Sequence, residues 1–129
     1  MEIKHKVWIE KDDEIIMGMG REALLKAIKE TGSIAKAAEK VGFNYKKALS
    51  YIKAMEERSG QKIVITFKGG TERGGAKLTE FGEGLLKDFE SIINEYEKLR
   101  ERLQKGLKRR KYLSMIAYPK KGAKKDAEQ

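Results

Sequence analysis

Apolar residues between positions 31 and 41 recur at helical spacing. Ala35, Ala38 and Val41 share one side of a short helix. Ser33 precedes them and is a favoured N-cap residue, because its hydroxyl accepts a hydrogen bond from a free N–H of the first turn. Gly42 follows them and readily adopts the positive φ that a tight turn requires. The pattern predicts a short helix that begins after Ser33 and ends at a glycine turn.

A second helical pattern follows this turn directly. Asn44 provides the next N-cap, and Ala48, Ile52 and Met55 form an apolar stripe at steps of four and three. Two helices joined by a short turn that contains glycine are typical of a helix-turn-helix. We therefore predict this motif over residues 31–55, and the other elements are arranged around it.

The segment before the motif predicts a strand and a helix. Residues 3–10 alternate apolar and polar side chains, as a strand does, and Trp8 lies on the otherwise polar side. We expect Trp8 to pack on another element. Residues 20–30 carry Leu24, Leu25 and Ile28 as a helical stripe, and Gly32 is the expected left-handed residue at the end of that helix.

A β-hairpin is predicted after the motif. Residues 62–67 alternate as a strand, residues 68–77 form a basic loop with two Gly-Gly pairs, and residues 76–78 give a short return strand. A hairpin in this place is the wing of a winged helix. The loop lacks the Gly-Lys-Ser/Thr sequence that opens the helix of a Walker nucleotide site.

A heptad pattern extends from residue 85 to residue 103. Its apolar positions, which we call the heptad seam, are Leu85, Phe89, Ile92, Tyr96, Leu99 and Leu103. One small domain does not need so long a helix, so the pattern favours a dimerisation helix that pairs with its copy. The alternative is a helix that packs on its own domain. Gly106 ends the pattern.

Together these elements predict a mainly α fold with a small β wing, a winged helix-turn-helix followed by a long C-terminal dimerisation helix. The predicted division places the winged helix-turn-helix DNA-binding domain in residues 1–78 and the dimerisation helix in residues 79–105. Residues 106–129 form a basic tail, which we expect to be partly disordered.

Positive charge is unevenly distributed along the chain. The formal net charge is +9, residues 1–97 are neutral overall, and residues 98–129 carry all of the excess. Within the neutral part, residues 33–79 carry +6 between acidic flanks. Basic patches attract the phosphate backbone of nucleic acids whatever their sequence. The distribution favours double-stranded DNA as the partner of the motif. The tail either adds nonspecific phosphate contacts or is a solubilising extension.

The second helix of the motif is basic and hydrogen-bonding on its outward face. Lys46, Ser50 and Lys53 lie opposite the apolar stripe, flanked by Tyr45 and Lys47. The first turns of a recognition helix contact base edges, so Lys46 and Ser50 are base-edge candidates. The alternative is an ordinary amphipathic helix with solvated lysines. The candidate DNA-binding residues, with Lys53, Lys68, Arg73 and Lys77 assigned to phosphates, are Ser33, Asn44, Tyr45, Lys46, Lys47, Ser50, Lys53, Lys68, Thr71, Arg73 and Lys77.

Composition argues against several other functions. The chain has no cysteine and only His5, so it has no disulfide, thiol nucleophile or shared histidine metal site. No motif places a nucleophile beside a base, so we expect a protein that is not an enzyme and that holds no metal or cofactor. No apolar run reaches transmembrane length and no leader opens the sequence, so we expect a cytoplasmic protein without a membrane partner. No small-molecule effector is evident.

The motif and the hairpin together resemble one known family. The run TGSI at residues 31–34, Ala37-Ala38, Tyr45-Lys46, Ala54-Met55 and the Gly-Gly wing leading to Leu78-Thr79 and Gly82 resemble the N-terminal DNA-binding domain of ModE-type molybdate-responsive regulators. That domain is a LysR-like winged helix. The resemblance covers residues 18–104.

This resemblance implies a dimeric transcription factor of bacterial or archaeal type. It places DNA contacts on Ser33 and on Tyr45, Lys46, Lys47 and Ser50, and wing contacts on Lys68, Thr71 and Arg73. Leu49 stands where the family usually has an aromatic residue. The molybdate-binding domains of the family would follow the long helix, where this chain has a basic tail, so molybdate sensing is not expected.

The sequence thus predicts a homodimeric, sequence-specific DNA-binding transcriptional regulator. In this interpretation the long helices hold two recognition helices at a fixed separation. One alternative is a chromatin-like architectural protein that binds any duplex. Another is a winged helix that binds a protein, or an RNA.

Overall fold

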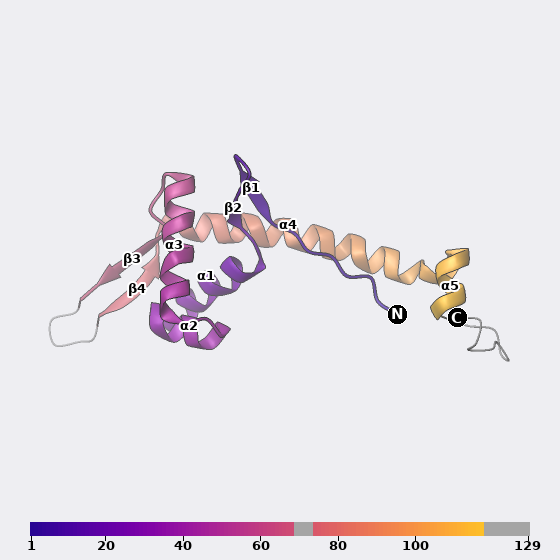
Figure 1. The fold of residues 1–129 in the computed structure, drawn as a ribbon, viewed down its shortest axis with the longest axis horizontal. Coiled ribbons are helices and arrows are strands. Elements are labelled where there is room, and N and C mark those ends of the chain that lie inside the picture. The colour runs from indigo at the N-terminus through magenta and orange to yellow at the C-terminus, as the bar shows by residue number, and fades with distance from the viewer. Residues whose placement is uncertain (69–73, 118–129) are drawn as a thin grey trace. The chain divides into compact units, whose positions relative to one another are not determined.

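The computed structural model describes residues 1–68 and 74–117 of the 129-residue chain. The elements, in chain order, are β1 (Ile9–Lys11), β2 (Glu14–Met17), α1 (Met19–Thr31), α2 (Ile34–Val41), α3 (Tyr45–Ser59), β3 (Val64–Phe67), β4 (Gly75–Leu78), α4 (Glu80–Lys105), η1 (Leu107–Arg109) and α5 (Lys111–Ala117) (Figure 1). The protein is mainly helical with two small antiparallel hairpins, β1–β2 and β3–β4.

The chain forms two compact units. Lys6–Ile93 form one, which we call the core unit, and Met1–His5 with the residues from Asn94 onward form the other, which we call the end unit. The first part of α4 belongs to the core unit and its last part to the end unit. The three-part division predicted from the sequence remains a prediction.

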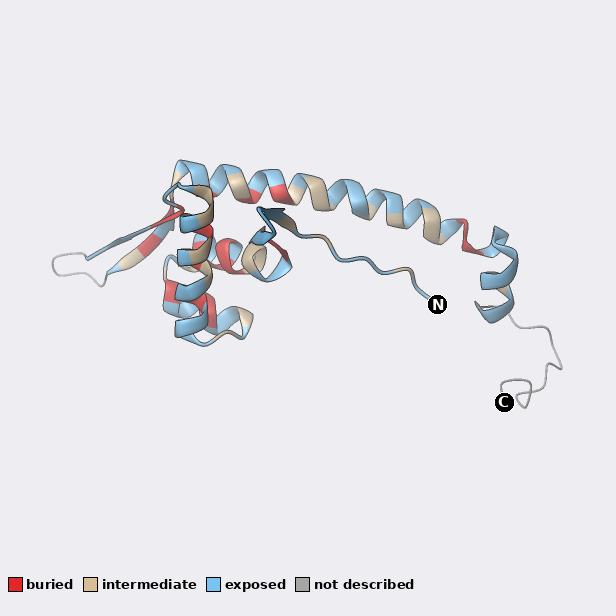
Figure 2. Cartoon of the chain, turned by 45° about the horizontal axis from the view of Figure 1, so that its top comes forward, coloured by how far each residue is buried: buried red, intermediate tan, exposed pale blue. Residues whose placement is uncertain are grey.

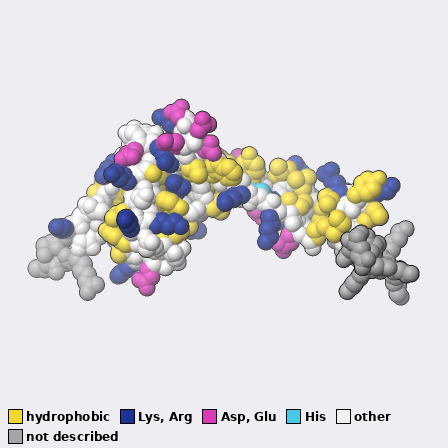
Figure 3. Space-filling model, viewed as in Figure 1, with side chains coloured by type: hydrophobic (Ala, Val, Ile, Leu, Met, Phe, Trp, Pro, Cys, Tyr) yellow, Lys and Arg dark blue, Asp and Glu magenta, His cyan; other side chains and the backbone are white. Residues whose placement is uncertain are grey.

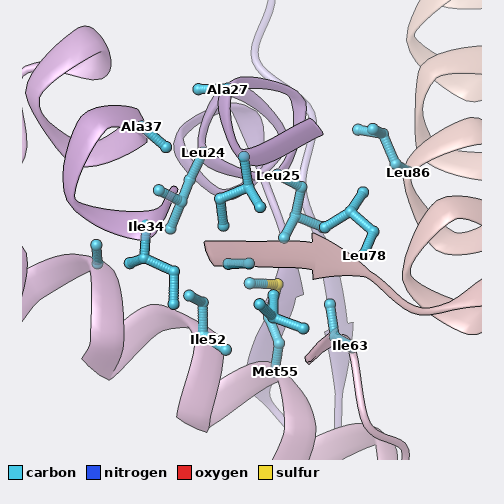
Figure 4. Packing of buried hydrophobic residues seen from close by; sticks show 14 of the residues in the cluster. Leu24, Leu25, Ala27, Ile34, Ala37, Ile52, Met55, Ile63, Leu78 and Leu86 are labelled. Carbon is cyan, nitrogen blue, oxygen red and sulfur yellow. The ribbon is translucent and has the colours of Figure 1, made fainter. Parts of the chain in front are cut away.

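The core unit is built around one apolar cluster. Helices α1, α2 and α3, the hairpin β3–β4 and the start of α4 each contribute buried side chains to it. Figure 4 shows these side chains converging between the helices and the hairpin. In α3 the buried residues are Ala48, Ile52 and Met55, which confirms the predicted stripe. Figure 2 shows the outward faces of the same helices as mainly exposed.

The predicted helix-turn-helix is present, with the predicted caps. The Ser33 side chain accepts a hydrogen bond from the Lys36 N–H, and the Asn44 side chain accepts one from the Lys47 N–H. Gly42 adopts a φ of 79° at the turn between α2 and α3. A side chain other than hydrogen would be strained in that conformation.

One detail of the predicted stripe in α2 is wrong. Ala35 is exposed, whereas Ala37 and Ala38 are buried with Ile34. A short helix with four alanine or valine positions can be rotated in more than one way without losing its apolar spacing. The packing of α1 against α2 selects Ala37, because α1 and α2 are the most extensively contacting pair of elements.

The predicted wing is also present. β3 and β4 pair in the register Val64↔Leu78 to Phe67↔Gly75. The Ala76 N–H also donates to the Gly32 carbonyl at 2.9 Å, which ties the wing to the end of α1. The loop residues 69–73, including Thr71 and Arg73, lie outside the described residues.

The strand predicted over residues 3–10 is wrong for most of its length. The strand β1 begins only at Ile9 and pairs with β2 through a turn at Asp12 and Asp13. Residues before it alternate in sequence but have no neighbouring strand to pair with. Trp8, which was predicted to pack on another element instead of facing water, is 49% exposed, and its Nε1–H donates to the Glu10 carboxylate at 2.6 Å.

The start of α4 is fixed to the residues just before β3 by a close approach. Thr79 caps the helix by accepting from the Gly82 N–H at 2.9 Å, and its hydroxyl donates to the Lys62 carbonyl at 2.7 Å. A Cβ atom at Gly82 would lie 2.4 Å from the Ile63 carbonyl oxygen. Only glycine therefore allows the helix to lie this close to the Ile63 carbonyl.

We expect Gly82→Ala to lower the free energy of unfolding by about 1–3 kcal/mol, because backbone must move to relieve the overlap. Urea denaturation measures the change. The matched control is Gly84→Ala, two residues along the same helix, where an added Cβ meets nothing within 4 Å. It should raise the free energy of unfolding by about 0.5–1 kcal/mol, since alanine is the better helix former. Equal effects of the two substitutions would contradict the close approach.

Candidate nucleic-acid interface

Helix α3 presents the predicted contact residues to solvent. Tyr45 is 52% exposed, and Lys46, Lys47, Ser50 and Lys53 are also exposed. The buried stripe of the same helix fixes this orientation, since its side chains occupy the opposite face. The first two turns of α3 thus offer ammonium and hydroxyl groups to a partner.

Two of the predicted contact residues first serve as helix caps. The Asn44 Oδ1 atom accepts from the Lys47 N–H at 2.7 Å, and the Ser33 Oγ atom accepts from the Lys36 N–H at 3.1 Å. Capping occupies the acceptor oxygens. The Asn44 NH2 group and the Ser33 hydroxyl proton are the groups that these residues can still offer to an acceptor such as a phosphate oxygen.

A shallow groove brings the motif and the wing together. It has a volume of about 400 Å³ and is lined by the start of α2, the start of α3 and the part of the wing next to its loop. Ser33, Tyr45 and Lys68, which are 12 or more positions apart in the sequence, all line it. Lys77 is exposed on β4 and is not part of this lining.

A second groove of about 270 Å³ lies along α3 and includes Leu49 and Lys53. Glu56 also lines it, but its carboxylate is engaged in the fold. One oxygen accepts from the Ile63 and Val64 N–H groups at 2.8 and 3.2 Å, and the other lies 3.6 Å from the Lys62 ammonium. This acid therefore anchors β3 to α3, and its charge is largely satisfied where a DNA backbone would approach.

Basic side chains dominate the surface over α3. Figure 3 shows lysine and arginine gathered there, while acidic side chains gather over the β1–β2 turn. In the described residues of the core unit, the carboxylates Glu83, Glu30, Glu14 and Glu56 pair with Lys29, Lys40, Arg58 and Lys62. The hydrogen bond from Lys40 lowers the pKa of Glu30. The lysines of the outward face of α3 are not among these ion-paired residues.

Arg21, near the start of α1, was not predicted from the sequence. Its guanidinium lies 4.3 Å from the centre of the Tyr51 ring, and the Lys47 ammonium lies 5.5 Å from the same point. Lys47 is also 4.2 Å from the centre of the Phe43 ring. Partial burial lowers the pKa of Arg21, with Arg58 acting in the same direction and Tyr51 in the opposite one. No sequence pattern marks this contact, because it depends on how α1 packs on α3.

The heptad seam is divided between the two units, and one assignment in it is corrected. In the core unit Leu85 and Ile92 are half-buried, but Phe89 is 0% exposed and belongs to the apolar cluster of that unit. A side chain that its own unit covers completely cannot contact a second copy. Phe89 is therefore removed from the predicted dimerisation residues.

In the end unit the remaining seam residues are accessible. Tyr96 is 47% exposed, Leu99 is 38% exposed and Leu103 is half-buried. The N-terminal segment lies on this part of α4, which the sequence did not indicate. The Ile3 N–H donates to the Gln104 side chain at 2.8 Å, and the His5 ring stacks on Tyr96 with centroids 6.0 Å apart.

Two negative observations concern the described residues only. Within residues 1–68 and 74–117, no cluster of three histidine, cysteine, aspartate or glutamate side chains could hold a metal ion. Over the same ranges, every helix is too short or too polar to cross a membrane.

Comparison with known proteins gives three findings. Residues 22–83 match the family described as "Bacterial regulatory helix-turn-helix protein, lysR family". "Molybdenum-pterin-binding protein MopB" of Rhodobacter capsulatus is 41% identical over 91 residues, which are 70% of this chain and 34% of that protein. "DNA-binding transcriptional dual regulator ModE" of Escherichia coli K12 is 35% identical over 78 residues, which are 60% of this chain and 30% of that protein.

The fold also matches a solved structure. The protein in "Crystal structure of CbnR_DBD-DNA complex" superposes with a TM-score of 0.55 at 20% identity, covering 70% of this chain and 98% of that one. This likeness confirms the predicted winged helix-turn-helix fold. The chain spans about a third of the length of the curated relatives it matches. Residues 22–83 thus form a helix-turn-helix domain of the LysR type, and the chain is homologous to the ModE and Mop proteins.

Proposed function

We propose that this protein is a sequence-specific DNA-binding transcriptional regulator that acts as a homodimer. The observation that carries the proposal is the orientation of α3, whose buried stripe leaves Tyr45, Lys46 and Ser50 exposed on its first two turns. The relatives named as regulators, and the LysR-type domain, support the same conclusion. They support a binding protein rather than an enzyme.

The proposed mechanism divides the contacts between bases and backbone. Lys46 and Ser50 contact base edges in the major groove, where each base pair presents its own pattern of donors and acceptors. Lys53, Lys68 and Lys77 contact phosphates, which set position and affinity but not sequence. Ser33 and Asn44 cap α2 and α3, and their remaining donor groups form hydrogen bonds with the DNA phosphates.

A dimer supplies the second recognition helix. The accessible seam residues Tyr96, Leu99 and Leu103 are the proposed contacts between two copies of the chain. Apolar side chains of α5, among them Tyr112 and Ile116, are also exposed in the end unit. Two helix-turn-helix units held at a fixed separation read two half-sites of a pseudo-palindrome.

Selection of bound duplexes from a random pool, read by sequencing, tests the function directly. We expect enrichment of one sequence with two related halves. A gel-shift competition at moderate salt then compares this duplex with random DNA. Equal competition would support an architectural protein, and loss of all duplex binding would support a protein-binding or RNA-binding winged helix. Either result would overturn the proposal.

Lys46→Ala should cost about 1–3 kcal/mol of binding free energy on the selected duplex if Lys46 reads a guanine, and much less on random DNA. The matched control is Lys53→Ala on the same helix. Because Lys53 is assigned to phosphate, its removal should weaken all duplexes alike and reduce the slope of log K against log salt by about 1. Fluorescence anisotropy measures both. A uniform loss with Lys46→Ala would reassign that residue to the backbone.

Leu99→Asp should convert the dimer to a monomer, because it places a carboxylate in the apolar contact between two copies. Sedimentation equilibrium measures the mass. Asn94→Asp adds the same charge to an exposed position on the other side of α4 and should leave the dimer intact. A Leu99→Asp variant that stays fully dimeric would place the interface elsewhere.

A further inference from the structure

Two cations beside the recognition helix are held by aromatic rings instead of carboxylates. Arg21 and Lys47 lie 4.3 and 5.5 Å from the centre of the Tyr51 ring. The Phe43 and Tyr51 rings meet edge to face, with centroids 5.5 Å apart. A carboxylate would neutralise a cation, but an aromatic face attracts it through its quadrupole and leaves the full charge in place. Two positive charges therefore remain available at this point.

The neighbouring arginine shows the contrast. Arg58 lies close enough to lower the pKa of Arg21. Its own groups have partners, because its Nε atom pairs with the Glu14 carboxylate at 3.0 Å and its Nη1 donates to the Ile15 carbonyl at 2.5 Å. Arg58 is thus used within the fold. Neither Arg21 nor Lys47 has a carboxylate partner in the described part of the chain.

One atom of Arg21 is left unsatisfied. Its Nε atom is inaccessible to solvent and meets no hydrogen-bond acceptor among the described residues. A charged group that is partly removed from water without a partner is unfavourable for folding. The inaccessible Nε atom cannot itself reach a ligand, but the two terminal nitrogens of the same guanidinium are suited to an oxyanion such as phosphate.

The place of the pair agrees with a phosphate of DNA. Tyr45 and Lys47 are two residues apart, so they lie about 200° apart around α3, with Lys46 between them. Tyr45 faces the groove that the wing residues line. Lys47 lies on the other flank, toward α1. A helix in the major groove has a phosphate backbone on each side. The wing contacts the backbone on one side, so contact with the backbone on the other side requires other cations.

We propose that Arg21 and Lys47 together bind one backbone phosphate of duplex DNA on the flank of α3 opposite the wing. Tyr51 and Phe43 are positioning residues that hold the two cations for this contact. Gly20 packs against both rings, which places the start of α1 beside them. The proposal rests on the proposed function. It adds Arg21 to the contact residues that the sequence suggested, and it gives the aromatic pair a positioning role.

The first test measures affinity against salt concentration for the selected duplex and for random DNA. Arg21→Gln should weaken both by the same factor, about tenfold, and reduce the slope of log K against log salt by about 0.9. Lys40→Gln removes the same charge from a lysine paired with Glu30 and should leave the slope unchanged. Tyr51→Leu should reproduce the loss, whereas Tyr51→Phe keeps the aromatic face and should not.

A second test separates a phosphate contact from a merely structural role. Neutral methylphosphonates replace single phosphates of the selected duplex in turn. For the wild-type protein, replacement of one phosphate on the flank opposite the wing should weaken binding. For Arg21→Gln, the same replacement should cause no further loss of affinity. Arg21→Lys retains the charge and should retain most of the salt slope, even where thermal unfolding shows a lower stability. Independent, additive losses from the protein and DNA changes would overturn the assignment.

The source of the anion is tested by NMR of the Arg21 side-chain Nε–H group. We expect its signal to shift on addition of the duplex and not with inorganic phosphate at the same ionic strength. An equal shift with inorganic phosphate would make this a general anion site and overturn the DNA assignment. If the wild-type protein binds no duplex, the proposed function and the phosphate contact both fail. If it binds normally and Arg21→Gln is indistinguishable from it, only the phosphate contact fails.

Discussion

The burial of one stripe of α3 is the constraint on which the rest of the core unit depends. Ala48, Ile52 and Met55 enter the shared apolar cluster, so the rotation of the helix is fixed and Lys46 and Ser50 must face outward. The caps fix where the helix begins, and the glycine turn fixes its angle to α2. Because apolar contacts hold this arrangement, the polar groups of the outward face are not needed for folding and remain free for a partner.

The charged groups of the core unit also divide into those that the fold uses and those that remain for a partner. Glu56 anchors β3 through two backbone N–H groups, and Glu14 holds Arg58, so these two acids are used internally. Arg21 and Lys47 are held by Tyr51 and Phe43, which position a cation without cancelling it. The first turns of α3 therefore keep the positive charges of their exposed lysines, and the acids of this helix, Glu56 and Glu57, come only in its later turns.

The features that could be predicted from the sequence are those whose signals are local. Ser33, Gly42 and Asn44 each act on backbone groups within a few residues, so the motif and its exposed face followed directly from the pattern. The contact of Arg21 with Tyr51 depends on the packing of two helices, and no spacing rule reveals it. The segment before β1 alternates as a strand should, but a strand also needs a neighbour, and Met1–His5 instead meet the side chain of Gln104 about 100 positions away.

The heptad seam shows the limit of a periodic pattern most clearly. A repeat of four and three identifies which side chains share one face of α4, but it says nothing of what covers that face. Phe89 is covered by the core of its own unit, while Tyr96 and Leu99 remain accessible in the end unit. The turns around Phe89 therefore pack on their own unit, whereas the turns of Tyr96 and Leu99 carry apolar side chains that their own unit leaves accessible.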